Sequence, residues 1–239
     1  IGGSLMGKEL FIDPEFEARC PPLTEDEFRQ LEKNILEEGL ILMPLIIWDN
    51  TIIDGHNRYR IAQEHPGISF RTHEKQFNSR YEALSWICMN QLGRRNLTPQ
   101  QKKYLIGQRY KAEKNIHGGD RKSDTAKSSS QNGNLISPLK TCERIAEESK
   151  TSKSYVIRAE HFSDGLDAAE EVLPGIRQDL LLGKYKPKEA DVAAIAKAPQ
   201  EERLERAEKL REPKPRQRNP PQISADAGSM RTSTGYTKN

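Results

Sequence analysis

Apolar residues repeat at helical spacing in the first part of the chain, at Phe28, Leu31 and Ile35. Thr24 precedes them, and Glu27 three residues later completes the spacing of a capping box. Gly39 follows the last apolar position, where a glycine commonly ends a helix. The pattern therefore predicts a helix that begins after Thr24 and ends at Gly39.

Short apolar runs elsewhere in the first half predict strands. Residues 44–48 and 51–53 form a strand pair joined by a turn at Asp49-Asn50, and residues 10–12 and 68–77 are two further strand candidates. Helical signals separate these runs. They predict helices over residues 57–64, from Ser79 to Leu92 and from Thr98 to about Asn115, the last supported by the first-turn Pro99.

The second half has only helical periodicity. Residues 116–138 are rich in Gly, Ser, Asn and charged residues, which predicts a flexible basic linker. Residues 139–211 follow with helical spacing alone, and residues 212–239, rich in Pro, Ser and Thr, are predicted to be disordered. We therefore expect an α+β domain over residues 8–115 and an all-α domain over residues 139–211.

Composition narrows the class of protein. A length of 239 residues suffices for two small domains, and 34% hydrophobic against 31% charged residues indicates modest cores with long solvated helices. The longest apolar run, residues 40–48, is interrupted by Pro44 and is far shorter than a membrane span, so no membrane partner is expected. The chain begins without the pattern of a signal peptide, which favours the cytoplasm. Three widely spaced cysteines predict free thiols.

Positive charge gathers in the middle of the chain. Residues 91–127 contain ten Lys/Arg and three Asp/Glu, a net charge of +7, although the whole chain carries only +3. Clustered cations release counterions from phosphates on binding, so this stretch suggests a polyanionic partner. A solvated helix face continued by a basic linker explains the same count equally well.

A glycine and two arginines lie between the second strand of the pair and the next helix, at Gly55, Arg58 and Arg60. Such a junction suits phosphate, because glycine lets the backbone approach, the first helical N–H groups donate and arginine offers a charged fork. A tight turn with arginines on a solvated helix is the alternative.

The order of these elements, together with Gly-x-x-Arg-Tyr-Arg after the strand, resembles the N-terminal domain of ParB proteins, which share a fold with sulfiredoxin. The ParB box reads Gly-Glu-Arg-Arg-x-Arg; here His56 replaces the glutamate and Asn57 replaces a basic residue. The resemblance implies a pocket for CTP or another nucleoside triphosphate, with Mg²⁺. It assigns nucleotide binding to Gly55, His56, Asn57, Arg58 and Arg60.

Two residues of this segment are candidate catalytic groups. His56 titrates near neutral pH and could move a proton beside a phosphate, although a neutral hydrogen-bonding role explains it as well. Asp54 could hold Mg²⁺ or cap the turn. The three cysteines show no close Cys/His pairing of the kind that binds zinc.

Residues 141–149 and 152–162 predict two helices with a short break, and Ala146 precedes Val156 by ten residues. This spacing suits a helix-turn-helix, in which a small residue allows a close crossing, and Lys150 stands where such turns usually have glycine. An ordinary helical hairpin is the alternative. ParB relatives carry such a motif after the pocket domain. The resemblance therefore implies that DNA is contacted by Ser152, Lys153, Ser154, Tyr155 and Arg158. Arg94 and Arg95 would contact the sugar-phosphate backbone of the DNA.

The sequence thus predicts a ParB-like protein that binds double-stranded DNA as a homodimer. Its nucleotide pocket would regulate DNA binding, in plasmid or mobile-element partition or in transcriptional regulation. An enzyme on the same fold, such as a slow nucleoside triphosphatase, a nuclease or a kinase, is the first alternative. A partner-recruiting or replication adaptor is the second.

Overall fold

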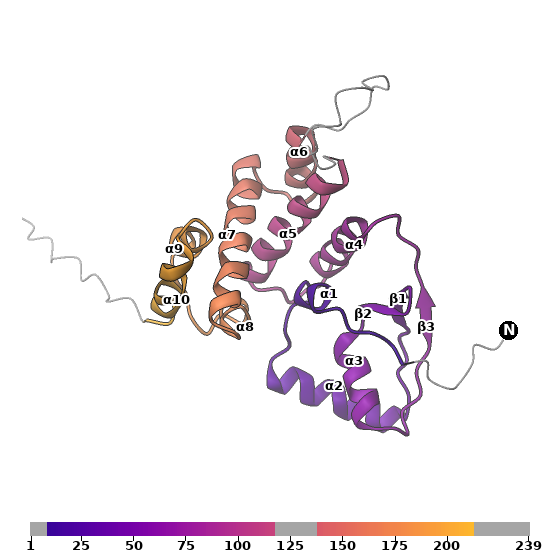
Figure 1. Cartoon of the computed structure of the whole chain (residues 1–239). Helices are drawn as coiled ribbons and strands as arrows, with labels where there is room; N and C mark the ends of the chain where they lie inside the picture. Colours follow the sequence, from indigo (N-terminus) through magenta and orange to yellow (C-terminus); the bar gives the residue numbers. More distant parts are fainter. Residues whose placement is uncertain (1–8, 118–137, 213–239) are drawn as a thin grey trace, which may run out of the picture.

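The computed structural model describes residues 9–117 and 138–212 (Figure 1). The N-terminal part mixes helices with a small sheet: α1 Pro14–Ala18, α2 Glu25–Glu38, β1 Leu45–Trp48, β2 Thr51–Asp54, α3 His56–Glu64, β3 Thr72–Glu74 and α4 Arg80–Leu92. The remainder is helical: α5 Pro99–His117, α6 Pro138–Glu148, α7 Lys153–Val172, α8 Ile176–Leu181, α9 Glu189–Ile195 and α10 Gln200–Lys209. The predicted fold class, α+β followed by all-α, is confirmed.

Helix α2 begins and ends where its local signals predicted. The Glu27 backbone N–H donates to Thr24 Oγ1 at 3.2 Å, and the Thr24 N–H donates to the Glu27 carboxylate at 2.8 Å. Gly39 closes the helix with a φ of 68°, a left-handed conformation that glycine adopts without steric cost. Both ends of α2 are therefore fixed by its own sequence.

The sheet has the order β2-β1-β3. Strands β1 and β2 are antiparallel, and Asp49 and Asn50 between them have φ of 47° and 65°, the backbone of a tight hairpin turn. Strand β3 pairs with β1 in parallel. It is shorter than the predicted strand because residues 71–75 contain no apolar side chain to bury. The predicted strand at residues 10–12 is reduced to a single bridge between Phe11 and Thr51.

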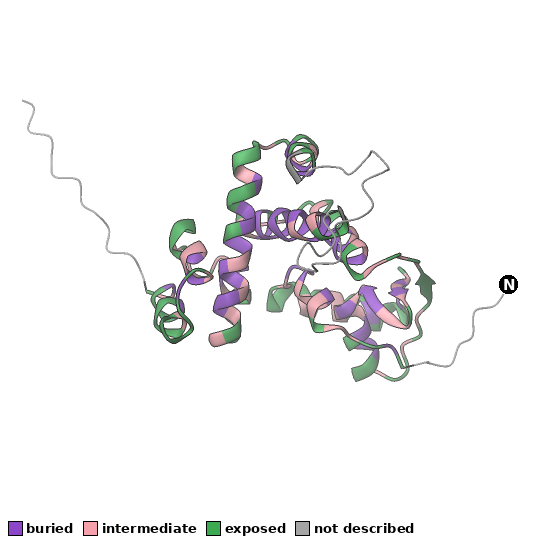
Figure 2. Cartoon of the chain, turned by 45° about the horizontal axis from the view of Figure 1, so that its top comes forward, coloured by how far each residue is buried: buried purple, intermediate pink, exposed green. Residues whose placement is uncertain are grey.

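Helix α5 packs on both parts of the molecule. Its Ala112 belongs to the apolar cluster of α4 and the sheet, whereas Ile106 and Tyr110 pack against α6 and α7. Figure 2 shows α5 buried along most of its length. A close approach explains part of this burial, because a Cβ on Gly107 would lie 2.1 Å from the Ala159 carbonyl oxygen of α7. Where the chain divides into domains stays a prediction.

Helices α6 and α7 confirm the two helices that were predicted around Lys150, and α7 runs ten residues beyond the predicted end. The predicted linker falls almost wholly on residues 118–137 and the predicted disordered tail on residues 213–239, outside the described residues. No helix in the described ranges is long and apolar enough to cross a membrane. Cys20, Cys88 and Cys142 are free thiols, as expected.

Candidate functional site

A cavity of about 650 Å³ lies beside the amino end of α3. One wall comes from the N-terminal part, namely the end of α1, the first turns of α2 and the residues His56, Asn57 and Arg60 of α3. The other wall comes from α7 and α8, with Glu170, Arg177, Gln178 and Leu181. A ligand in this cavity would therefore touch both parts of the chain at once.

Gly55 is the N-cap residue of α3 and gives the chain its turn from β2 into this helix. Its φ is 107°, and a Cβ at this position would lie 2.7 Å from Leu45 Cδ2 of β1, so a side chain fits neither the conformation nor the space. No side chain of the described residues caps α3. The first N–H groups of a helix have no partner within it, so the amino end of α3 offers donors to an anion.

Arg58 acts inside the protein in this arrangement. Its guanidinium donates to the Met43 carbonyl at 2.6 Å, to the Pro44 carbonyl at 3.2 Å and to Asp54 Oδ2 at 2.9 Å. Arg58 does not line the cavity, whereas Arg60 does, where it forms an ion pair with Glu17. The predicted phosphate contacts of Arg58 and Arg60 both stay predictions, and Arg60 is the one of the two that borders the cavity.

Asp54 joins three segments. Oδ2 accepts from Arg58, Oδ1 accepts from Gln91 Nε2 of α4 at 2.9 Å, and an Arg94 nitrogen lies 3.8 Å from Oδ1. Both carboxylate oxygens therefore already have partners that hold the strand end, α3 and α4 together. The predicted catalytic or magnesium-binding role of Asp54 stays a prediction. The predicted contact of Arg94 with the DNA backbone stays one as well.

His56 is almost fully buried, with 3% of its surface exposed. Nδ1 lies 3.5 Å from Cys20 Sγ, and Nε2 has no hydrogen-bond partner in the described structure. Burial lowers the pKa of the imidazole to about 4; Asp54 opposes this shift and Arg60 adds to it. The neutral form expected from the sequence is therefore the form that this environment favours.

Acid should destabilise the protein through His56. With an ordinary pKa of 6.5 in the unfolded chain and about 4 in the fold, the unfolded chain binds more protons between these values. Stability then falls as the pH drops from about 6.5 to 4, by up to about 3 kcal/mol. Urea unfolding of the wild type and His56→Gln at pH 7 and pH 5 measures this.

The glutamine variant should lack most of that slope, whereas His73→Gln, a change at an exposed position of β3, should retain it. Identical pH dependence in the wild type and His56→Gln would show that another group is responsible.

A buried polar network lies behind the second wall of the cavity. Arg19 donates to Tyr104 Oη at 2.8 Å, and Tyr104 donates to Asp167 Oδ1 at 2.8 Å. Asp167 also accepts from Gln108 at 2.6 Å and from Arg177 at 3.0 Å. The network ties the end of α1 to α5, α7 and α8. Sequence reasoning missed it, since its members share no motif.

The predicted DNA-contacting residues gather at the amino end of α7. Ser152 caps this helix by accepting from the Tyr155 N–H, and Lys153, Ser154 and Arg158 are exposed. Lys153 forms an ion pair with Glu143 of α6, and Tyr155 is half-buried under the Lys103 ammonium group. Arg158 makes no hydrogen bond or ion pair with any described residue. The amino end of α7 is thus polar and accessible.

The crossing of α6 and α7 has the predicted close packing. Ala146 and Val156 are both buried in one cluster with Cys142 and Ile145. Lys150 has a φ of 52°, the left-handed turn conformation that glycine usually supplies. The two helices therefore pack against each other across a tight turn, and the helix-turn-helix assignment stays a prediction.

In its described part, residues 91–117, the basic stretch is not a continuous cationic surface. Four of its cations on α5 form ion pairs with acids of the helical part, in the pairs Lys103–Glu189, Arg109–Glu148, Lys111–Asp164 and Lys114–Glu160. Arg94, Arg95 and Lys102 are exposed. Arg121, Lys122 and Lys127 lie outside the described residues. The cations of α5 therefore mainly hold helices together.

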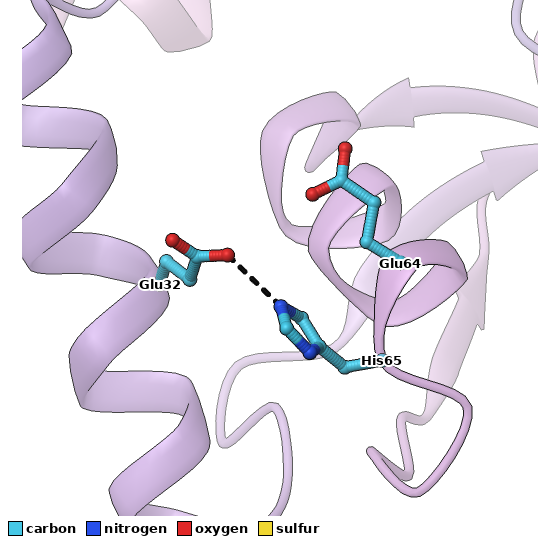
Figure 3. A group of neighbouring side chains, drawn as sticks. All are labelled: Glu32, Glu64 and His65. Atoms are coloured by element: carbon cyan, nitrogen blue, oxygen red, sulfur yellow. Dashed lines mark hydrogen bonds and ion pairs between the residues drawn. The ribbon is translucent and has the colours of Figure 1, made fainter.

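Glu32, Glu64 and His65 form a separate group at the carboxyl end of α3 (Figure 3). Their ligand atoms lie within 4.8 Å of one another, as a divalent cation would require. His65 Nε2 already lies 2.9 Å from Glu32 Oε1, and these residues are apart from the cavity lining.

Comparison with known proteins gives structural matches only. No protein-family model matches the chain, and no curated protein does. The chain is similar to a Pnob8-like ParB-N domain, at 17% identity over 85% of this chain and 94% of that one, with a TM-score of 0.47. It is also similar to the C-terminally truncated chromosome-partitioning protein ParB from Caulobacter crescentus complexed with CTP-γ-S, at 17% identity over 85% and 95%, with a TM-score of 0.31.

Proposed function

We propose that the chain is a ParB-like DNA-binding protein. Helices α6 and α7 bind double-stranded DNA, and the cavity beside α3 binds a nucleoside triphosphate that regulates DNA binding. The biological setting is partition or transcriptional control. The observation that carries the proposal is the packed α6–α7 pair, whose second helix presents an exposed, polar amino end.

The amino end of α7 suits DNA for three reasons. A helix amino end carries partial positive charge and attracts phosphate. Ser152 and Ser154 offer hydroxyl groups, and Arg158 offers a guanidinium that no described residue occupies. In a helix-turn-helix this end of the second helix enters the major groove.

Replacing Lys153 and Arg158 with alanine should weaken duplex binding by tenfold or more in moderate salt. Each lost phosphate contact should also reduce the slope of log K against log salt by about one. Fluorescence anisotropy with a labelled duplex at several salt concentrations measures both quantities.

A matched control removes two exposed lysines elsewhere on the molecule, Lys33 of α2 and Lys209 of α10, each of which is ion-paired within its own helix. This double variant has the same net charge as the first one and should bind DNA nearly as the wild type does. Equal loss in both variants would mean that only overall charge matters, and α7 would no longer be the DNA-reading helix.

The cavity suits a triphosphate through its α3 wall. The amino end of α3 has no side-chain cap at Gly55, and Asn57 and Arg60 of this helix line the cavity. Arg177 and Gln178 approach from the α8 wall. Because the ligand would touch both parts of the chain, its binding can change where the amino end of α7 lies and so change the affinity for DNA. DNA binding must then change the affinity for the nucleotide by the same factor, because such coupling is reciprocal.

Arg60→Gln should weaken triphosphate binding by about tenfold or more, since a charge-assisted hydrogen bond is lost. Calorimetry with CTP, ATP and GTP in the presence of Mg²⁺ measures this, and Lys33→Ala is the control outside the cavity. If none of the three nucleotides binds the folded wild type, the pocket has another use. Rapid release of phosphate would favour the enzyme alternative instead.

A further inference from the structure

Large apolar side chains are exposed around the carboxyl end of α2. Leu42 and Met43 have 58% and 69% of their surface exposed, and they lie shortly after Gly39, which closes this helix. Leu36 in the last turn of α2 and Leu40 after Gly39 are exposed as well. Single exposed apolar residues are ordinary, whereas a group of them at one place commonly marks an interaction site. We call these four leucine and methionine residues the α2-end patch.

The segment between α2 and β1 is apolar both where it is buried and where it is exposed. Ile41 is buried and packs with Ile35 of α2 and Ile61 of α3. Its neighbours Leu40 and Leu42 are exposed. In a half-buried extended segment, polar residues usually alternate with the buried apolar ones. The exposed leucines therefore do not serve the core, and they are available to a partner.

Hydrogen bonds hold the main chain of this patch in place. The Arg71 guanidinium donates to the Leu42 carbonyl at 3.3 Å, and the Arg58 guanidinium donates to the Met43 carbonyl at 2.6 Å. These bonds use backbone oxygens only, so the side chains of Leu42 and Met43 remain exposed. A surface that is already ordered loses little conformational freedom when it binds.

One acidic and one basic group flank the patch. Glu38 is the last residue of α2 and forms no hydrogen bond or ion pair within residues 9–117 and 138–212. A negative charge at the carboxyl end of a helix is unfavourable, and the last turn of α2 has no basic residue to offset it. At the other end of the patch, Arg71 is exposed and lies beside Leu42 and Leu45, and no ion pair joins it to a described residue.

We propose that a second copy of this chain packs on the α2-end patch and is related to the first by a two-fold axis. In such a dimer both subunits use the same surface, so the surface must be complementary to itself. The apolar patch with an acid at one end and a cation at the other meets this condition. Glu38 faces Arg71 of the partner subunit, and this contact forms twice.

The two flanking charges favour a second copy over other partners. A cationic peptide on the patch would match Glu38 but would meet the like charge of Arg71, and an acidic peptide would have the reverse conflict. The homodimer expected from the sequence had no surface assigned to it, and the α2-end patch supplies one. This inference uses neither the nucleotide nor the DNA of the proposed function.

The experiment measures the mass of the full chain by sedimentation equilibrium over a wide range of concentration. The wild type should pass from monomer to dimer in the micromolar range, as expected of a small interface. Leu42→Glu should weaken the dimer by about tenfold or more, because it would bury an unpaired carboxylate. Leu204→Glu, at an exposed leucine of α10, is the matched control and should dimerise as the wild type does.

Exchange of the two charges tests the two-fold arrangement. Glu38→Arg and Arg71→Glu should each weaken the dimer by about tenfold, because like charges then face each other at both contacts. In a mixture of these two variants, opposite charges face each other again in every mixed dimer. The mixture should therefore dimerise about as tightly as the wild type, and so should the variant that carries both changes.

The outcomes decide for or against the patch. A wild type that stays monomeric at every concentration would overturn the proposal and leave the patch to a different partner. A dimer that Leu42→Glu does not weaken, or charge variants that do not recover on mixing, would place the contact elsewhere and overturn it as well. Circular dichroism checks that each variant folds. If Leu42→Glu does not fold, the mixing experiment with the two exposed charges decides.

Discussion

Replacing Gly107 with alanine should destabilise the protein by roughly 3 kcal/mol or more, although alanine is the better helix former by about 1 kcal/mol. A Cβ at this position would lie 2.1 Å from the Ala159 carbonyl oxygen, 2.5 Å from its carbonyl carbon and 2.7 Å from Ser163 Oγ. Two of these atoms belong to the α7 backbone and cannot rotate away. The helices must therefore separate along their contact.

The same reasoning makes this change a test of the architecture. Helix α5 is the element that packs against α4 on one side and α7 on the other, so its displacement affects both parts of the chain. We expect the urea midpoint to fall and DNA binding to weaken together. Far-ultraviolet circular dichroism at low temperature checks that the variant still folds before its unfolding is compared with that of the wild type.

Gly67→Ala is the matched control. Gly67 is exposed, and a Cβ there would meet no atom within 4 Å, so this variant should unfold within about 0.5 kcal/mol of the wild type. A stable Gly107→Ala variant would mean that α5 and α7 do not approach as closely as described.

The elements that the sequence predicted well are those with local signals. The capping box of Thr24 and Glu27 spans four residues, and the hairpin turn spans two. The turn before α3 depends on the left-handed conformation of one residue, Gly55. The contact between α6 and α7 could also be predicted from the sequence, because Ala146 and Val156, ten positions apart, are both buried in it. Such features need no knowledge of distant parts of the chain.

The parts that the sequence did not reveal depend on contacts between distant residues. The sequence could not show that Arg58 donates to carbonyls 14 and 15 positions away, and its predicted phosphate contact stays a prediction. The hydrogen bond from Arg19 to Tyr104 spans 85 positions. A count of Lys and Arg residues likewise could not show that four of them face acids on other helices. Charge and motif patterns give residue types, whereas only the fold shows which partners those residues meet.

A buried ion-pair network between α5 and α6 provides the last prediction. Arg109 Nε donates to Glu113 Oε1 at 2.7 Å, and both side chains are about 5% exposed. Glu113 also accepts from Ser85 of α4 at 3.0 Å and pairs with Arg144 of α6, while Arg109 pairs with Glu148. Removing Glu113 leaves the Arg109 charge buried with fewer partners. Glu113→Ala should therefore destabilise the protein by about 3–5 kcal/mol.

A double-mutant cycle separates the pair from the cost of an orphaned charge. Glu113→Leu and Arg109→Met should each destabilise the protein strongly, whereas the double variant should be less destabilised than the two losses added together, because apolar side chains of similar volume then face each other. The exposed pair Arg206–Glu202 on α10 is the control, and its cycle should give a coupling below about 1 kcal/mol. Urea unfolding of all variants measures these couplings. If the Arg109–Glu113 coupling equals that of the surface pair, water screens these two charges, and their pairing within α5 stabilises the protein no more than a surface pair does.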